Sequence, residues 1–246
     1  MNQPHYPRLR IFAGPNGSGK STLIDRLKKE INLYRIINPD VLYQELTRNK
    51  IIDLSSYEIQ NIPITFSQFI KNSTYSDKIK TGLSSAYIKQ NRLYINSVKI
   101  DPYIVALISA FLRNCMVYNL LSFSFETVFS HPSKIGFLKK AELSGYRNYL
   151  YYLATDNQEI NVGRVKQRVT EGGHSVPEGK IRSRYNLSLN NLLPALKYTY
   201  RAYIFDNSGE ESRWIAEVTP KGTLLLKTAT IPIWFNEFVL NHLPML

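Results

Sequence analysis

One stretch near the start of the 246-residue chain reads GPNGSGKST, from Gly14 to Thr22. Its spacing is that of the P-loop motif, G-x4-G-K-[ST]. The glycines let backbone N–H groups converge on a phosphate at the start of a helix, where the helix dipole also favours negative charge. The candidate nucleotide-binding residues are Gly14, Pro15, Asn16, Gly17, Ser18, Gly19, Lys20, Ser21 and Thr22.

The flanking residues have the pattern that this motif requires. Residues 9–13 form a short apolar run typical of a buried strand, and Leu23, Leu27 and Ile31 recur every four residues, as on one face of a helix. In a strand–loop–helix unit of this kind, Lys20 is expected to reach the β- and γ-phosphates of ATP or GTP. The hydroxyl of Ser21 is placed to coordinate Mg²⁺.

Strand and helix patterns alternate along most of the chain. Further strands are predicted near residues 35–37, 122–128, 149–154 and 202–205. Helices are predicted after the caps or proline starts at Asn38-Pro39, Asp101-Pro102, Pro132 and Asp156, the last with Glu159 at capping-box spacing, and over 181–196. This alternation predicts an α/β fold, a P-loop kinase-type parallel sheet with helices on both faces.

The domain organisation that follows is a single domain over residues 1–246. It carries an insertion at about 50–100, expected to be mostly helical, and a lid at about 164–184. A C-terminal extension at about 210–246 is expected to contain a β-hairpin from residues 214–218 and 223–226.

Composition limits the partners and the location. Lysine and arginine number 31 against 19 acidic residues, a net charge of +12 that attracts nucleic acid, membrane surfaces or phosphorylated small molecules. The single cysteine excludes an internal disulfide and a cysteine-based zinc site. The apolar run at 104–112 is too short to span a bilayer, and residues 1–10 lack a signal-peptide core, so we expect a cytoplasmic protein without a membrane segment.

Two strand ends carry acids that suit phosphoryl-transfer chemistry. Asp40 follows the second strand, where it could accept the proton of an acceptor hydroxyl, or it could serve only the first turn of a helix. Glu126 and Thr127 end a later strand. Glu126 could hold Mg²⁺ through water or orient the substrate, and Thr127 could contact either of them. The alternative is that Glu126 simply faces solvent.

The predicted lid is basic. Arg164 and Arg168 are four residues apart and share a helical face, while Arg184 follows a hinge-like GGHSVP segment that contains His174. Mobile arginines near phosphates would neutralise charge during transfer. The alternative for the arginines is a solvated basic face. His174 could act as an acid or base, but without a visible partner the sequence favours a structural or substrate-contacting role for it.

Taken together, these segments resemble the zeta-toxin family, in particular its zeta-toxin-like P-loop kinases. The matching stretches are IFAGPNGSGKST, INPD, SFETVFSHPSK, EINVGRVKQRV, GGHSVPEGKIRSRY and YIFDNS, spanning about residues 8–208. The resemblance implies ATP or GTP with Mg²⁺ as donor, with Lys20 and Ser21 on phosphate and metal. It further implies Asp40 as catalytic base, Glu126 and Thr127 on substrate and metal, and Arg164, Arg168 and Arg184 as lid arginines.

Three functions remain open at this point. The first is a kinase acting on a hydroxyl of a small anionic metabolite, such as UDP-N-acetylglucosamine, which zeta toxins proper phosphorylate; a separate antitoxin would then be a partner. The second is a P-loop NTPase or nucleotide switch that binds nucleic acid or a protein, although no nucleic-acid-binding module is recognisable. The third is a kinase for an antibiotic or another neutral metabolite.

Overall fold

The computed structural model describes residues 6–73, 77–96, 99–173 and 175–243. The chain divides into two compact units, one made of Met1–Leu33 with Ser124–Leu246 and the other of Tyr34–Phe123. The second unit contains the predicted insertion at 50–100 and extends beyond it at both ends. The single-domain organisation stays a prediction.

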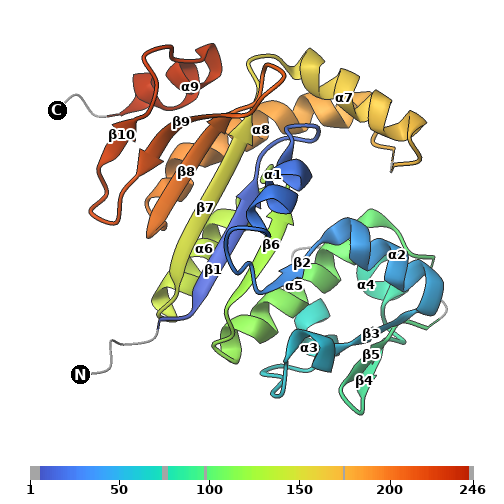
Figure 1. The fold of residues 1–246 in the computed structure, drawn as a ribbon. Coiled ribbons are helices and arrows are strands. Elements are labelled where there is room, and N and C mark those ends of the chain that lie inside the picture. The colour runs from blue at the N-terminus through green and yellow to red at the C-terminus, as the bar shows by residue number, and fades with distance from the viewer. Residues whose placement is uncertain (1–5, 74–76, 97–98, 174, 244–246) are drawn as a thin grey trace, which may run out of the picture. The chain divides into compact units, whose positions relative to one another are not determined.

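The first unit is built on a mostly parallel sheet. Its strands are β1 (Arg8–Ala13), β6 (Phe123–Thr127), β7 (Arg147–Ala154), β8 (Arg201–Asp206), β9 (Arg213–Val218) and β10 (Leu224–Leu226). Their order is β10-β9-β8-β7-β1-β6, as Figure 1 shows. β7 pairs in parallel with β1 and β8, whereas β9 runs antiparallel to β8 and β10. The predicted α/β fold and the C-terminal hairpin are confirmed.

The helices of this unit follow the predicted order. They are α1 (Lys20–Leu27), α6 (Ser133–Leu143), α7 (Gln158–Thr170), α8 (Glu178–Leu196), α9 (Ile233–Phe238) and the 3₁₀ turn η2 (Leu240–His242). The stripe that predicted a helix as far as Ile31 was too long, because α1 ends at Leu27. Tighter turns follow, with the N–H of Lys29 donating to the carbonyl of Arg26.

One predicted helix cap is wrong. Asn157, not Asp156, caps α7, because its side chain accepts the N–H of Glu159 at 2.8 Å. The neighbouring Asp156 is held by tertiary contacts instead. Its N–H donates to the Ser208 hydroxyl at 2.8 Å, and its carboxylate accepts the N–H of Trp234 at 3.3 Å.

The central strands bury both faces of the sheet. On one face, the hydroxyl of Tyr152 lies 3.0 Å from that of Ser188 on α8. Burial raises the pKa of this tyrosine far above its ordinary value. On the other face, Tyr151 stacks between Phe12 and Tyr203, with ring centroids 4.9 and 5.0 Å away. Strands covered on both sides read as nearly continuous apolar runs, which is why β1 and β7 were predictable.

The second unit combines helices with a small sheet. It contains β2 (Arg35–Ile37), α2 (Pro39–Asn49), β3 (Ile51–Asp53), the 3₁₀ turn η1 (Leu54–Tyr57), α3 (Phe66–Lys71), α4 (Asp77–Gly82), β4 (Tyr87–Lys89), β5 (Arg92–Tyr94) and α5 (Pro102–Tyr118). Helices were expected in the insertion, but an antiparallel sheet in the order β3-β5-β4 was not. Its strands have three residues each, too few to display a period of two.

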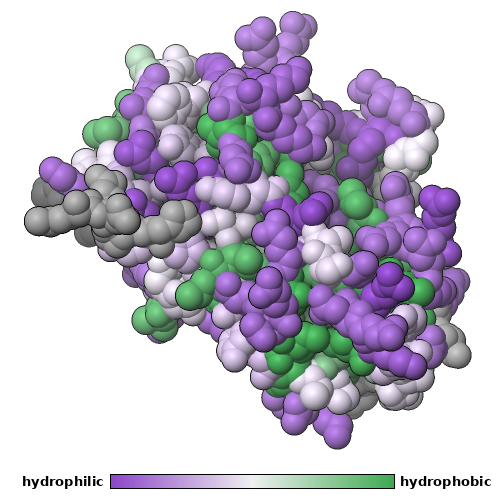
Figure 2. Space-filling model, turned by 60° about the horizontal axis from the view of Figure 1, so that its bottom comes forward, coloured by the Kyte–Doolittle hydropathy of each residue, from purple (hydrophilic) through white to green (hydrophobic). Residues whose placement is uncertain are grey.

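Hydrophilic side chains cover most of the face drawn in Figure 2, with small apolar patches between them. This agrees with the excess of lysine and arginine in the sequence. Among the helices of the described ranges, none is both long and apolar enough to cross a lipid bilayer.

Candidate nucleotide-binding site

The loop from Gly14 to Gly19 joins β1 to α1, as predicted, and its backbone accepts only glycine at key points. Gly14 has φ +142°, and a Cβ atom there would lie 2.0 Å from the carbonyl oxygen of Leu153. Gly17 and Gly19 have φ +74° and +92°, in the region that favours glycine. Gly14 and Gly17 lie against neighbouring backbone and Gly19 lies against the side chain of Asn207, so there is no space for side chains at these positions.

Lys20 is the first residue of α1 and is buried. Its Nζ donates to the carbonyl oxygens of Gly14 and Pro15 at 2.9 and 2.8 Å. The same nitrogen lies 4.0 Å from a carboxylate oxygen of Glu126, at the end of β6. The side chains are only 6% and 16% exposed, so charge interactions here are stronger than at the surface. The structure thus brings together two residues predicted from separate motifs.

The loop also contains buried polar groups that the rest of the described chain does not satisfy. The Ser18 hydroxyl and the side-chain oxygen of Asn16 have no hydrogen-bond partner among the described residues. Buried polar atoms almost always have a partner, so such groups suit a loop that binds a polar ligand. The cradle therefore fits the phosphates of a nucleotide.

The predicted metal ligands have suitable chemistry. Ser21 is exposed on the first turn of α1, directly after Lys20, whose Nζ lies 4.0 Å from the Glu126 carboxylate. Hydroxyl and carboxylate oxygens are ligands that Mg²⁺ prefers. Thr127 is half-buried, and its hydroxyl accepts the N–H of Phe129 at 3.1 Å, an arrangement that fixes the end of β6.

Asp40 belongs to the second unit, in the first turn of α2, and it is exposed. Asn38 caps this helix, as predicted. Its side-chain oxygen accepts the N–H groups of Asp40 and Val41 at 2.8 and 3.4 Å. The carboxylate of Asp40 is therefore not the helix cap, and its role as a base stays a prediction.

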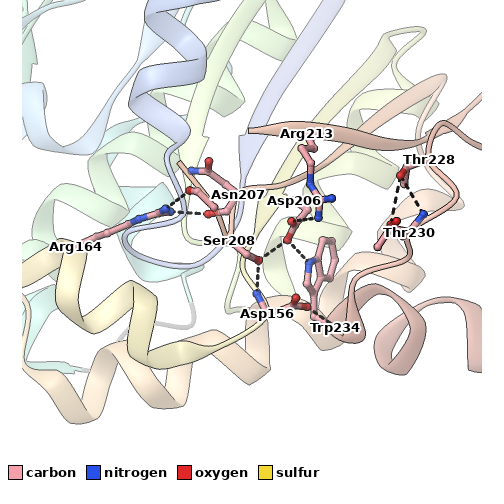
Figure 3. Close-up of polar contacts among 10 residues, drawn as sticks. Asp156, Arg164, Asp206, Asn207, Ser208, Arg213, Thr228, Thr230 and Trp234 are labelled. Carbon is pink, nitrogen blue, oxygen red and sulfur yellow. Dashed lines mark hydrogen bonds and ion pairs between the residues drawn. The ribbon is translucent and has the colours of Figure 1, made fainter. Parts of the chain in front are cut away.

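The predicted lid residues lie on two helices. Arg164 and Arg168 are half-buried on α7, and Arg184 is half-buried on α8. The Arg164 guanidinium donates to the carbonyl oxygens of Asn207 and Gly209 at 2.7 and 2.9 Å, as Figure 3 shows. His174 lies outside the described residues.

Arg182 is a basic residue of the same segment with a different environment. It forms ion pairs with Glu159 and Glu178, and these charge-assisted hydrogen bonds lower the pKa of both carboxyl groups. Glu178 also pairs with Lys166 at 3.1 Å. These exposed pairs connect α7 to α8 and neutralise part of the charge that the sequence pattern placed here.

The structure adds two residues that the sequence did not single out. Asn161 on α7 donates its amide to the carbonyl oxygen of Asn16 at 2.5 Å. Asn207, directly after β8, donates to the carbonyl oxygen of Ser18 at 2.9 Å. Both lie in stretches quoted for the family resemblance, but no spacing rule marks an asparagine as a partner of a distant loop.

Sequence comparisons with known proteins do not identify a family for the chain. No family model matches the chain. Over 65 residues, 26% of this chain and 46% of the relative, the sequence is 35% identical to an uncharacterized protein of Haemophilus influenzae. The chain thus spans less than half the length of that curated relative.

Solved structures match over nearly the whole chain. The crystal structure of AvrRxo1-ORF1:AvrRxo1-ORF2 with sulphate ions has a TM-score of 0.61 and 15% identity, covering 98% of this chain and 66% of that one. A crystal structure of AvrRxo1-ORF1:-ORF2 with ATP gives a TM-score of 0.58, 16% identity and the same coverage. The chain spans just under two thirds of those chains. At such low identity, the TM-scores show that the α/β fold is shared, and membership of the zeta-toxin family stays a prediction.

The lack of space for a side chain at Gly14 leads to a first prediction. We expect Gly14→Ala to lower the free energy of unfolding by about 2 kcal/mol or more, because a non-glycine residue is strained at this φ and the methyl group collides with the Leu153 carbonyl. Urea denaturation measures the change. Gly163→Ala on α7 is the control. Nothing lies within 4 Å of its added Cβ, so it should be neutral or stabilising by up to about 1 kcal/mol. Equal stability of the two variants would contradict the close approach at Gly14.

Proposed function

We propose that the chain is a phosphotransferase that binds ATP or GTP with Mg²⁺ and transfers the γ-phosphoryl group to a hydroxyl of a small anionic metabolite. The observation that carries this proposal is the buried Lys20 at the glycine loop with Glu126 at 4.0 Å. A cation, a row of backbone N–H groups and a carboxylate are the parts that phosphoryl transfer uses for positioning and charge neutralisation.

Each part has a proposed task. The loop amides and Lys20 bind the phosphates, and Ser21 and Glu126 hold Mg²⁺, which when bound neutralises phosphate charge. Asp40 accepts the proton of the acceptor hydroxyl as that oxygen bonds to the γ-phosphorus and the bond to the leaving diphosphate breaks. Thr127, Arg184 and His174 are proposed substrate contacts.

The acceptor is proposed to be anionic because the chain carries a net charge of +12. A nucleotide sugar such as UDP-N-acetylglucosamine satisfies this condition. A separate antitoxin is also proposed, supported by the two-component composition of the AvrRxo1-ORF1:AvrRxo1-ORF2 structure that shares the fold.

Mass spectrometry tests the proposal directly. The protein is incubated with Mg·ATP or Mg·GTP and a panel of nucleotide sugars, other phosphorylated metabolites and neutral sugars or antibiotics. The expected result is a mass gain of one phosphoryl group on an anionic member. Transfer only to a neutral compound would overturn the proposal of an anionic acceptor. Hydrolysis of ATP or GTP without transfer to any compound of the panel would overturn the proposal that the chain is a kinase.

The same net charge favours a second candidate, a P-loop NTPase or switch that binds nucleic acid or a protein partner. Oligonucleotide binding that weakens steeply with salt, together with ATP hydrolysis and no acceptor transfer, is the result expected for it.

The lid arginines give a second prediction. If Arg164 and Arg168 neutralise charge that develops during transfer, alanine at either position should lower kcat by about 10²-fold or more. Arg182→Ala is the control, because its ion pairs are exposed and such pairs contribute little to stability. Steady-state kinetics measures all three variants. Equal kcat values in the Arg168 and Arg182 variants would indicate that Arg168 belongs to a solvated basic face and takes no part in phosphoryl transfer.

A further inference from the structure

Two asparagines that lie outside the loop in the sequence donate their side-chain amides to backbone carbonyls of the loop. Besides the Asn161 contact with the Asn16 carbonyl, Asn207 donates to the Ser18 carbonyl. Both asparagines lie close to glycines of the loop. A Cβ atom at Gly17 would lie 2.7 Å from the backbone carbonyl oxygen of Asn161, and one at Gly19 would lie 2.2 Å from the side-chain Nδ2 of Asn207. Gly19 is therefore required by the side chain of Asn207, and Gly17 by the backbone of α7 at Asn161.

These contacts determine where the loop directs its donors. The C=O of Ser18 and the N–H of Gly19 belong to one planar trans peptide unit and point in opposite directions. Because Asn207 fixes the carbonyl, it also fixes the direction of the Gly19 N–H. In the same way, Asn161 fixes the carbonyl of Asn16 and therefore the direction of the Gly17 N–H. Converging N–H groups are what a P-loop offers to a phosphate, so the amides of the two asparagines preorganise that surface.

Asn207 is itself held firmly. Its N–H donates to the Ala154 carbonyl at 2.8 Å, and its own carbonyl accepts from Arg164. The preceding residue, Asp206, is 1% exposed. Its carboxylate accepts from three donors, the Trp234 indole N–H at 3.1 Å, the Arg213 guanidinium at 2.9 Å and the Ser208 hydroxyl at 2.6 Å. Figure 3 shows this cluster beside Arg164 and Asn207.

Two of the three donors to Asp206 come from the C-terminal extension. Arg213 begins β9, and Trp234 lies on α9, where it is 1% exposed. A buried carboxylate is stable only when it is paired and hydrogen-bonded, so β8 can end in Asp206 only while the extension supplies these donors. The C-terminal extension therefore stabilises the end of β8, a role that the proposed phosphoryl-transfer mechanism does not include.

We propose that Asn207 is a positioning residue for nucleotide binding, which sets the direction of the Gly19 N–H, and that the C-terminal extension holds it in place through Asp206 and Trp234. The inference rests on the proposed function only in taking residues 14–22 as a nucleotide-binding loop.

The test compares ATP affinity with stability in the full chain. Titration calorimetry and thermal midpoints with and without ATP are measured for the wild type, Asn207→Ala and Asn207→Leu, whose side chain is branched at the same carbon but cannot donate. Neither substitution changes charge. Loss of one hydrogen bond that orients a phosphate donor should weaken ATP binding about 10-fold. Trp234→Phe keeps the ring but removes the donor to Asp206, and it should weaken binding about threefold.

Asn148→Ala is the matched control. This asparagine donates to the carbonyls of Leu138 and Tyr198, at the start of β7 and away from the loop. It should lower the thermal midpoint and leave ATP affinity within twofold of the wild type. Asn207 variants that behave in the same way would overturn the positioning role, and unchanged affinity in Trp234→Phe would overturn the link to the extension. A wild-type protein that does not bind ATP would instead overturn the proposed function together with this inference.

Discussion

Lys20→Ala is expected to remove phosphoryl transfer, with kcat/KM lower by at least about 10²- to 10³-fold, the loss seen when one preorganised electrostatic contact to a transition state is deleted. The ammonium group is buried against the carbonyls of Gly14 and Pro15, where low solvent exposure strengthens its attraction for phosphate. Its loss also leaves Glu126 without this nearby cation, which further disfavours the approach of anionic phosphates.

Turnover with the best acceptor, ATP affinity and far-UV circular dichroism are the measurements for this variant. Lys20→Met keeps the aliphatic stem and should behave in the same way, which separates lost charge from lost packing. Lys28→Ala provides the matched control. Lys28 follows the same helix, is about half exposed and pairs with Asp25 at 3.1 Å, an exposed pair of small energetic value. Wild-type turnover in both Lys20 variants would show that Lys20 and its loop are not needed for phosphoryl transfer.

Asp40→Asn is expected to lower kcat by about 10²- to 10⁴-fold, the contribution of a general base, while ATP affinity stays within a few-fold. The substitution keeps the shape of the side chain and removes its negative charge. The structure sharpens this expectation because Asn38, not Asp40, accepts the first N–H groups of α2. Asp40 therefore does not cap the helix, and losing its charge from the first turn of α2 should lower the free energy of unfolding by at most about 1 kcal/mol.

Glu45→Gln on the same helix is the control for Asp40→Asn. Burial and the nearby charge of Asp53 raise the pKa of Glu45, so a neutral replacement is well tolerated there. The Glu45 variant should keep kcat, although it loses the same unit of charge from α2. Asp40→Asn with normal kcat would exclude this residue as the base and favour an NTPase or switch.

Local sequence rules were sufficient for the phosphate loop and for most of the secondary structure. A G-x4-G-K-[ST] spacing, an apolar run before it and a four-residue stripe after it act over fewer than about 30 residues, and helix caps act over three or four. The caps at Asn38 and Asp101 are therefore where the sequence predicts them. The end of α1 and the cap of α7 were mispredicted, because turns after Leu27 and tertiary contacts of Asp156 outweigh local preference.

What only the tertiary structure decided is the set of partners that hold the loop. Asn207 and Ser18 are 189 residues apart, and Asn161 and Asn16 are 145 apart. No periodicity connects positions so distant, because they meet only once parallel strands have aligned their carboxyl ends in one sheet. The burial of Asp206 likewise depends on Trp234, which reaches it from the far end of the chain. The sequence determined that a phosphate loop forms, since its backbone requirements are local. The packed sheet decided which side chains orient it, since hydrogen bonds between distant segments exist only in the folded chain.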